Sequence, residues 1–167
     1  MLIRNEEPKD YLAVHRINAS AFTTPAEADL VDVLRKEAYP TISLIAEENG
    51  EPVGHIMFSP VTLSGDTDLL IMGLGPMAVV SEQQSKGIGS TLVRIGLEKC
   101  KQLGYGAVVV LGHPWFYPRF GFLPSLRFGI DSEYDVPEEI FMVIELEPGY
   151  LQGASGTIRY HPAFSGV

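Results

Sequence analysis

The sequence predicts an α/β fold in a single domain spanning residues 1–167, with a central mixed sheet flanked by helices. Helical and strand-like stretches alternate along the chain, and the strongest helical stretch lies between two apolar strands. Such a strand–helix–strand unit implies a right-handed crossover and parallel pairing of its strands. No internal repeat or linker divides the chain, and 46% hydrophobic against 20% charged residues is an ordinary globular balance.

The first forty residues predict one strand and two helices. "LIR" opens the chain as a short strand, and residues 7–22 follow as a helix. The second helix covers residues 24–38 and has a strong start signal. Thr24 is placed to cap it, Pro25 takes the first helical position, and Glu27 completes a Thr-x-x-Glu capping box.

The rest of the chain predicts mainly strands around one long helix. Residues 43–63 read as a β-hairpin, because two apolar runs flank the Asn-Gly turn of "ENGEP". Residues 69–80 predict a third strand, which two glycines and a proline interrupt. A helix follows from about residue 87 to 103. The fully apolar "AVVVLG", residues 107–112, should then be a central strand buried on both faces, and residues 139–146 supply a late strand.

Composition and charge argue against several classes of function. The net charge is −9 and the Lys and Arg residues do not cluster, so we expect no nucleic-acid partner. No apolar stretch is long enough for a bilayer and the N-terminus lacks a signal-peptide layout, so we expect no membrane partner and a cytoplasmic protein. A lone Cys100 suits that compartment. The histidines lack metal-ligand spacing, and we expect no metal; they are His15, His55, His113 and His161.

Glycine-rich stretches suggest three possible phosphate sites. The P-loop signature is absent, because Lys86 precedes its glycine. Residues 73–78, "GLGPMA", match the dinucleotide fingerprint but run on into a strand, so no helix N-terminus is available for a pyrophosphate. "QSKGIG", residues 84–89, does lie between a strand and the strongest helix. From the glycines alone, a phosphate cradle and a simple tight turn are about equally supported.

The wider segment "MAVVSEQQSKGIGSTLV" resembles the acetyl-CoA signature of the GNAT superfamily of N-acetyltransferases. Gln84, Gly87 and Gly89 fill the positions of its Gln/Arg-x-x-Gly-x-Gly/Ala motif, and "YPRFGF", residues 117–122, matches the Tyr-x-x-x-Gly-Phe of the family. The similarity covers nearly the whole chain and is nearest to a small bacterial branch of predicted acetyltransferases. One departure is "GHPWFYPR", which is too short and proline-rich for the helix and Asn that many members have there.

The resemblance implies a mostly antiparallel sheet splayed between its fourth and fifth strands, with acetyl-CoA as co-substrate in the splay. It implies that Met77 and Val79 pair with the pantetheine and that a strand N–H of Met77 or Ala78 polarises the thioester carbonyl. It also implies a pyrophosphate loop made by the N–H groups of Gln84, Ser85, Lys86, Gly87, Ile88, Gly89 and Ser90. Tyr117 would be the proton donor to the leaving thiolate, rather than only packing with Trp115, Phe116, Phe120 and Phe122.

The general base is less defined by the sequence. Glu27 faces inward on its helix, with the capping box favoured over catalysis. His55 is favoured as a hydrogen-bonded sheet histidine, and His113 is a substrate contact or a turn residue. Cys100 is on the core face of its helix and is expected to pack rather than react.

The expected activity is direct transfer of an acetyl group to a primary amine of a small-molecule or peptidic acceptor. The alternative is a non-catalytic acyl-CoA sensor or interaction domain on the same fold. A monomer and a homodimer are both compatible with the sequence.

Overall fold

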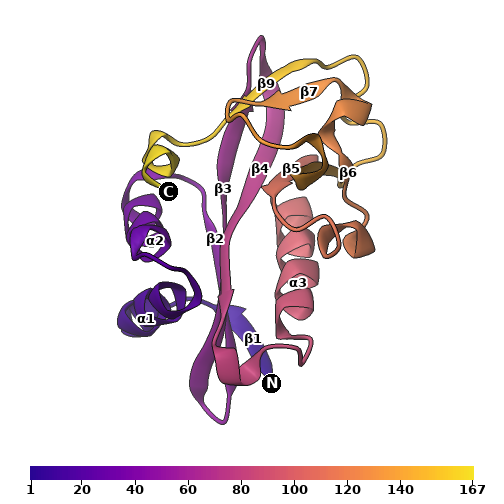
Figure 1. The fold of residues 1–167 in the computed structure, drawn as a ribbon. Coiled ribbons are helices and arrows are strands. Elements are labelled where there is room, and N and C mark those ends of the chain that lie inside the picture. Colours follow the sequence, from indigo (N-terminus) through magenta and orange to yellow (C-terminus); the bar gives the residue numbers. More distant parts are fainter. The chain divides into compact units, whose positions relative to one another are not determined.

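The computed structural model describes residues 1–167, apart from the side chains of residues 66 and 67. The chain forms two compact units, each built from segments that are separate in the sequence. Figure 1 labels the helices and strands along the chain. The first unit contains residues 1–59, 75–96 and 162–167, and the second contains residues 60–74 and 97–161. Two strands and one helix contribute residues to both units.

The first unit carries two helices and an antiparallel group of strands. The helices are α1 (Tyr11–Ala21) and α2 (Ala26–Glu37), and the strands are β1 (Leu2–Asn5), β2 (Ile42–Glu48) and β3 (Glu51–Leu63). β1 pairs with β2 and β2 with β3, all antiparallel. Asn49 and Gly50 turn the β2–β3 hairpin with φ values of 54° and 81°. Positive φ at both central residues is what a two-residue hairpin turn needs, so the predicted hairpin is confirmed.

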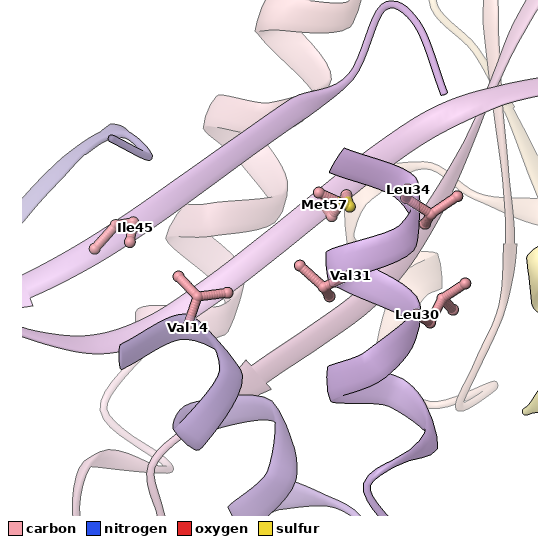
Figure 2. Packing of buried hydrophobic residues seen from close by; sticks show 6 residues of the cluster. All are labelled: Val14, Leu30, Val31, Leu34, Ile45 and Met57. Atoms are coloured by element: carbon pink, nitrogen blue, oxygen red, sulfur yellow. The ribbon is translucent and has the colours of Figure 1, made fainter. Parts of the chain in front are cut away.

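A hydrophobic cluster joins the two helices of the first unit to its strands. Figure 2 shows side chains from α1, α2, β2 and β3 gathered in one place; they are Val14, Leu30, Val31, Leu34, Ile45 and Met57. Ala163 and Phe164 from the C-terminal 3₁₀ turn pack against the same cluster. The 3.6-residue spacing of the α2 members is the amphipathic pattern that predicted this helix.

The second unit carries the parallel strand pair. β4 (Asp66–Val79) and β5 (Ala107–Leu111) run parallel, with register from Ile71↔Ala107 to Leu74↔Val110. β5 also pairs antiparallel with β8 (Phe141–Glu145), and four of its five residues are buried, as predicted for a central strand. β6 (Leu123–Pro124) pairs with β8, while β7 (Ile130–Ser132) pairs with β9 (Gly156–Arg159).

The strand order is β1-β2-β3-β4-β5-β8-β6, which confirms the predicted mixed sheet. The β4–β5 ladder ends at Leu74, so the last residues of β4 have no register with β5.

The predicted long helix is α3 (Ile88–Gln102), and its C-terminus is set by a glycine. Gly104 has φ of 91°, and the next residue, Tyr105, donates its N–H to the Cys100 carbonyl oxygen at 3.0 Å. Such a left-handed residue satisfies the last carbonyls of a helix. The Cys100 side chain is fully buried, and burial raises its thiol pKa to about 12, so its predicted packing role is confirmed. Across the described residues, no helix has both the length and the hydropathy needed to cross a membrane.

Candidate functional site

The segment between β4 and α3 is an exposed loop with an unusual backbone. After a 3₁₀ turn (Ser81–Gln83), Ser85 and Gly87 have φ values of 65° and 83°. Alternation between left-handed and ordinary residues turns successive N–H groups toward one side, which creates an anion-binding concavity. Ser85 is a non-glycine residue in the left-handed region, where such residues are uncommon. The residue type at position 85 therefore does not predict this conformation.

The N–H groups of this loop have no acceptors. Within the described part of the chain, none of the N–H groups from Ser85 to Ser90 donates a hydrogen bond to backbone or side chain. The Thr91 N–H is the first to be satisfied, by the Gly87 carbonyl oxygen at 3.0 Å. Unsatisfied donors at a helix N-terminus, with the positive end of the helix dipole behind them, form a ready site for a phosphate group.

The loop is held to the end of β4 and to β3. The Gln84 side-chain amide donates to the Val79 carbonyl oxygen at 3.0 Å, and the Val80 N–H donates to the Val53 carbonyl oxygen at 2.9 Å. The first turn of α3 rests on β3 at Gly54, where an added Cβ would lie 3.1 Å from Ile88 Cγ2. These contacts fix the direction of the unsatisfied N–H groups. Lys86 is exposed and donates to the Gln83 side chain at 3.3 Å.

The end of β4 supplies the other predicted cofactor residues. Ala78 is buried, Met77 and Val79 are half-buried, and all three lie beyond the last β4–β5 pair. Residues 73–78, which match the dinucleotide fingerprint, lie wholly within β4 and do not open a helix. The rejection of that motif as a nucleotide site is therefore consistent with the fold.

Tyr117 lies in the second unit at the start of a 3₁₀ turn (Tyr117–Phe120) and is 7% exposed. Its ring makes edge contacts with Phe116 and Phe122, at centroid distances of 5.0 and 5.6 Å. Gly112 admits the ring, because an added Cβ there would lie 2.2 Å from Tyr117 Cε2. Burial raises the pKa of Tyr117 to about 12, so the phenol keeps its proton at neutral pH.

The aromatic cluster considered as the alternative role of Tyr117 does not include Trp115. Trp115 is 72% exposed and stacks on the His113 ring at 4.5 Å, away from the ring contacts described for Tyr117.

Glu27 does not form the predicted capping box. α2 begins at Ala26 with Pro25 at the N-cap position, one residue later than expected, and the N-cap has no side-chain hydrogen bond. The Ala26 N–H instead reaches Thr24 Oγ1 at 3.3 Å. With Pro25 as the N-cap, Glu27 stands at N2 instead of the N3 position that a capping box requires, and proline has no N–H for it to accept. The Glu27 Oε2 atom is buried and has no hydrogen-bond partner among the described residues.

His55 is a structural histidine, as favoured from the sequence. It is fully buried, with Nδ1 3.1 Å from Asn18 Nδ2 and Nε2 2.8 Å from Ser43 Oγ. Burial, with a smaller contribution from the Arg35 charge, lowers its pKa to about 3, so the ring is neutral at ordinary pH. Its nitrogens are occupied, which leaves none for a substrate.

His15 has neighbours that sequence spacing did not reveal. Its ring nitrogens lie 2.9 Å from Asp32 Oδ2 and 3.9 Å from Asp29 Oδ1. These three side chains could hold a metal ion. They are partly or largely exposed, so the arrangement is described equally well as a surface ion pair.

The sequence did not indicate which glycines position the loop before α3 and the Tyr117 ring. Gly54 and Gly112 each allow a close approach, to α3 and to Tyr117 respectively. A lone glycine inside or directly after an apolar strand was the available signal, but it does not identify the partner.

Comparisons with known proteins agree on one family. A profile of the Acetyltransferase (GNAT) family matches residues 11–122. The chain is 36% identical over 166 residues, or 99% of both chains, to a protein of Escherichia coli K12 named uncharacterized N-acetyltransferase YhbS. The crystal structure of YhbS in complex with CoA matches with a TM-score of 0.92 at 34% identity, covering 98% of this chain and 91% of that one. A GNAT family acetyltransferase of Brucella melitensis in complex with acetyl-CoA matches with a TM-score of 0.80 at 32% identity, covering 98% and 97%.

Proposed function

Because the chain belongs to the acetyltransferase (GNAT) family, we propose that residues 1–167 act as one N-acetyltransferase domain that transfers the acetyl group of acetyl-CoA directly to a primary amine. The observation that carries this proposal is the run of unsatisfied N–H groups from Ser85 to Ser90. The relatives whose structures contain CoA or acetyl-CoA support the choice of ligand.

In this proposal the loop N–H groups bind the pyrophosphate of acetyl-CoA. Charge-assisted hydrogen bonds from backbone N–H groups suit a phosphate, and Lys86 adds a positive charge in a protein of net charge −9. The backbone of Met77 and Val79 pairs with the pantetheine, as an added strand would. An N–H of Met77 or Ala78 polarises the thioester carbonyl.

The chemical step needs one proton to move from nitrogen to sulfur. A neutral amine attacks the thioester carbonyl carbon, a C–N bond forms, the C–S bond breaks, and the nitrogen loses a proton while the thiolate gains one. Tyr117 donates to the sulfur. With its pKa near 12, transfer to a thiol of pKa ~8.5 would cost roughly 5 kcal/mol if the phenolate were left charged, so the phenol must regain the proton that the nitrogen loses.

Glu27 is the candidate base that takes a proton from the incoming ammonium. Its buried Oε2 without a partner is an acceptor that a substrate N–H can satisfy. Neither carbon–nitrogen bond formation nor thiolate release requires a metal or a covalent enzyme intermediate in this scheme.

Replacing Gly87 with alanine is expected to weaken acetyl-CoA binding about tenfold. Nothing lies within 4 Å of the added Cβ, but φ of 83° costs an alanine about 1.4 kcal/mol and drives the loop away from this conformation. The dissociation constant is measured by titration calorimetry. Gly104→Ala is a matched control, because Gly104 has φ of 91° and equally open space at the far end of α3. An equal loss of affinity in both variants would contradict the phosphate-loop assignment.

Replacing Glu27 with glutamine is expected to lower kcat/KM for the amine about 30-fold near neutral pH. The deficit should shrink as the pH approaches ~10, where an alkylamine is neutral without a base. Thiol release is measured across pH, with the exposed Asp29→Asn as control on the same helix turn. We also expect no loss of thermal stability, because an unpaired buried carboxylate oxygen is not stabilising. A pH-independent deficit, or a fall in Tm, would indicate a structural role instead.

A further inference from the structure

A groove of about 460 Å³ lies in the second unit. It is formed by β7, the segment 133–138 that follows it, and a 3₁₀ turn (Ser125–Phe128). A volume of this size is in the range of small-molecule sites.

Most of the charge in this groove is negative and unpaired. Four carboxylates line it: Asp131, Glu133, Asp135 and Glu138. Glu133 is engaged, since its Oε1 accepts the Tyr160 N–H at 2.7 Å and its Oε2 lies 3.8 Å from Arg159 Nη1. For the other three, no described residue offers a hydrogen bond or an ion pair. Like charges around one cavity repel, and a cationic ligand relieves that repulsion.

Two further side chains suit an ammonium ligand. Ser125 lines the groove and is only 3% exposed, yet within the described chain nothing pairs with its hydroxyl. A hydroxyl without a protein partner can accept a hydrogen bond from a ligand N–H. Tyr134 also lines the groove and is half-buried, and its ring face can bind a cation.

Within the described residues, the groove carboxylates do not form a cluster with metal-ligand spacing. Among the described residues, His15, Asp29 and Asp32 alone bring three possible metal-ligand atoms within 4.8 Å of one another. The groove carboxylates do not converge in this way. Separated negative groups fit a ligand whose positive charges are also separated.

The segment that lines the groove is hydrogen-bonded to Gly112, which lies against the Tyr117 ring. Glu138 and Phe141 line the groove, and between them the Ile140 carbonyl oxygen accepts the Gly112 N–H at 2.9 Å. Gly112 is the residue against which the Tyr117 ring packs. One backbone hydrogen bond thus links the segment that lines the groove to the residue against which Tyr117 packs.

We propose that this groove binds the distal ammonium groups of an aliphatic polyamine, which is the acceptor of the acetyl group. The assignment rests on the proposed acetyl transfer and names its substrate class. The unpaired carboxylates, the Ser125 hydroxyl and the Tyr134 ring supply ion pairs, a hydrogen bond and a cation–π contact.

Spermidine is the probe, titrated into the full-length protein by calorimetry without acetyl-CoA. Asp135→Asn and Glu138→Gln should each weaken binding about threefold, and the double variant about tenfold, because each removes one exposed charge interaction. Glu139→Gln is the matched control, since Glu139 is adjacent and exposed but does not line the groove. Butylamine, with a single charge, should bind at least tenfold more weakly, and trilysine should bind more weakly than spermidine.

In thiol-release assays, the double variant should raise the KM for spermidine about tenfold and leave kcat within twofold. Equal spermidine affinity in the wild type and the double variant would overturn the groove assignment, as would tighter binding of trilysine. If amines are turned over but the spermidine KM of the double variant is unchanged, acetyl transfer is supported. The assignment of the groove as the acceptor site is then wrong. Spermidine binding in the groove without thiol release from any amine would contradict acetyl transfer and the acceptor role.

Discussion

Replacing Tyr117 with phenylalanine is expected to lower kcat about 100-fold and to leave the KM for acetyl-CoA within about threefold. The ring contacts with Phe116, Phe122 and Gly112 are retained, because phenylalanine keeps the ring. What is lost is a hydroxyl that burial keeps protonated, with its pKa near 12, and that has no other described partner. The leaving thiolate then departs without a donor, so the loss falls on the chemical step.

Thiol release and acetyl-CoA calorimetry measure the two parts of this prediction separately. Tyr105→Phe is the control, because Tyr105 is a half-buried tyrosine of the same unit outside the proposed site. An unchanged kcat in Tyr117→Phe would show that the ring only packs. Tight acetyl-CoA binding without turnover of any amine in the wild type would favour a sensor over an enzyme.

Replacing Gly96 with alanine is expected to destabilise the protein by about 3 kcal/mol. Gly96 lies inside α3, and an added Cβ would be 2.2 Å from Cε1 and 2.5 Å from Cζ of Phe58, which is fully buried. The ring cannot move into solvent, so the helix must shift away from β3. Helix propensity alone predicts the opposite sign, a gain of about 1 kcal/mol, because alanine is a better helix former than glycine.

Urea unfolding measures the free energy of unfolding of the wild type and of Gly96→Ala. A double-mutant cycle with Phe58→Leu provides the control. Since leucine removes the ring atoms that meet the new Cβ, Gly96→Ala should cost at least 1.5 kcal/mol less in that background. A stabilising Gly96→Ala would show that propensity outweighs the contact, and an additive cycle would show that Phe58 is not the obstacle.

Local sequence patterns correctly predicted those helices, strands and turns whose conformation is set by residues close together in the chain. The Asn49–Gly50 turn, α3 with its Gly104 terminus, and the buried β5 all follow from turn chemistry or from a regular period, and all are present. The resemblance carried by "QSKGIG" and "YPRFGF" is confirmed by the family match. The capping box failed because Pro25 occupies the N-cap position, a shift of one residue that the pattern could not resolve.

The sequence by itself determined where the loop of unsatisfied N–H groups lies, because its glycines, its preceding strand and its following helix are contiguous. Only the tertiary structure decided which residues far apart in the chain come into contact and which polar atoms are buried. It left Glu27 Oε2 buried without a partner, set Gly96 against Phe58 and Gly112 against Tyr117, and brought separate carboxylates to one groove. Periodicity and turn chemistry report on residues a few positions apart, whereas burial and close approach depend on packing between segments far apart in the chain.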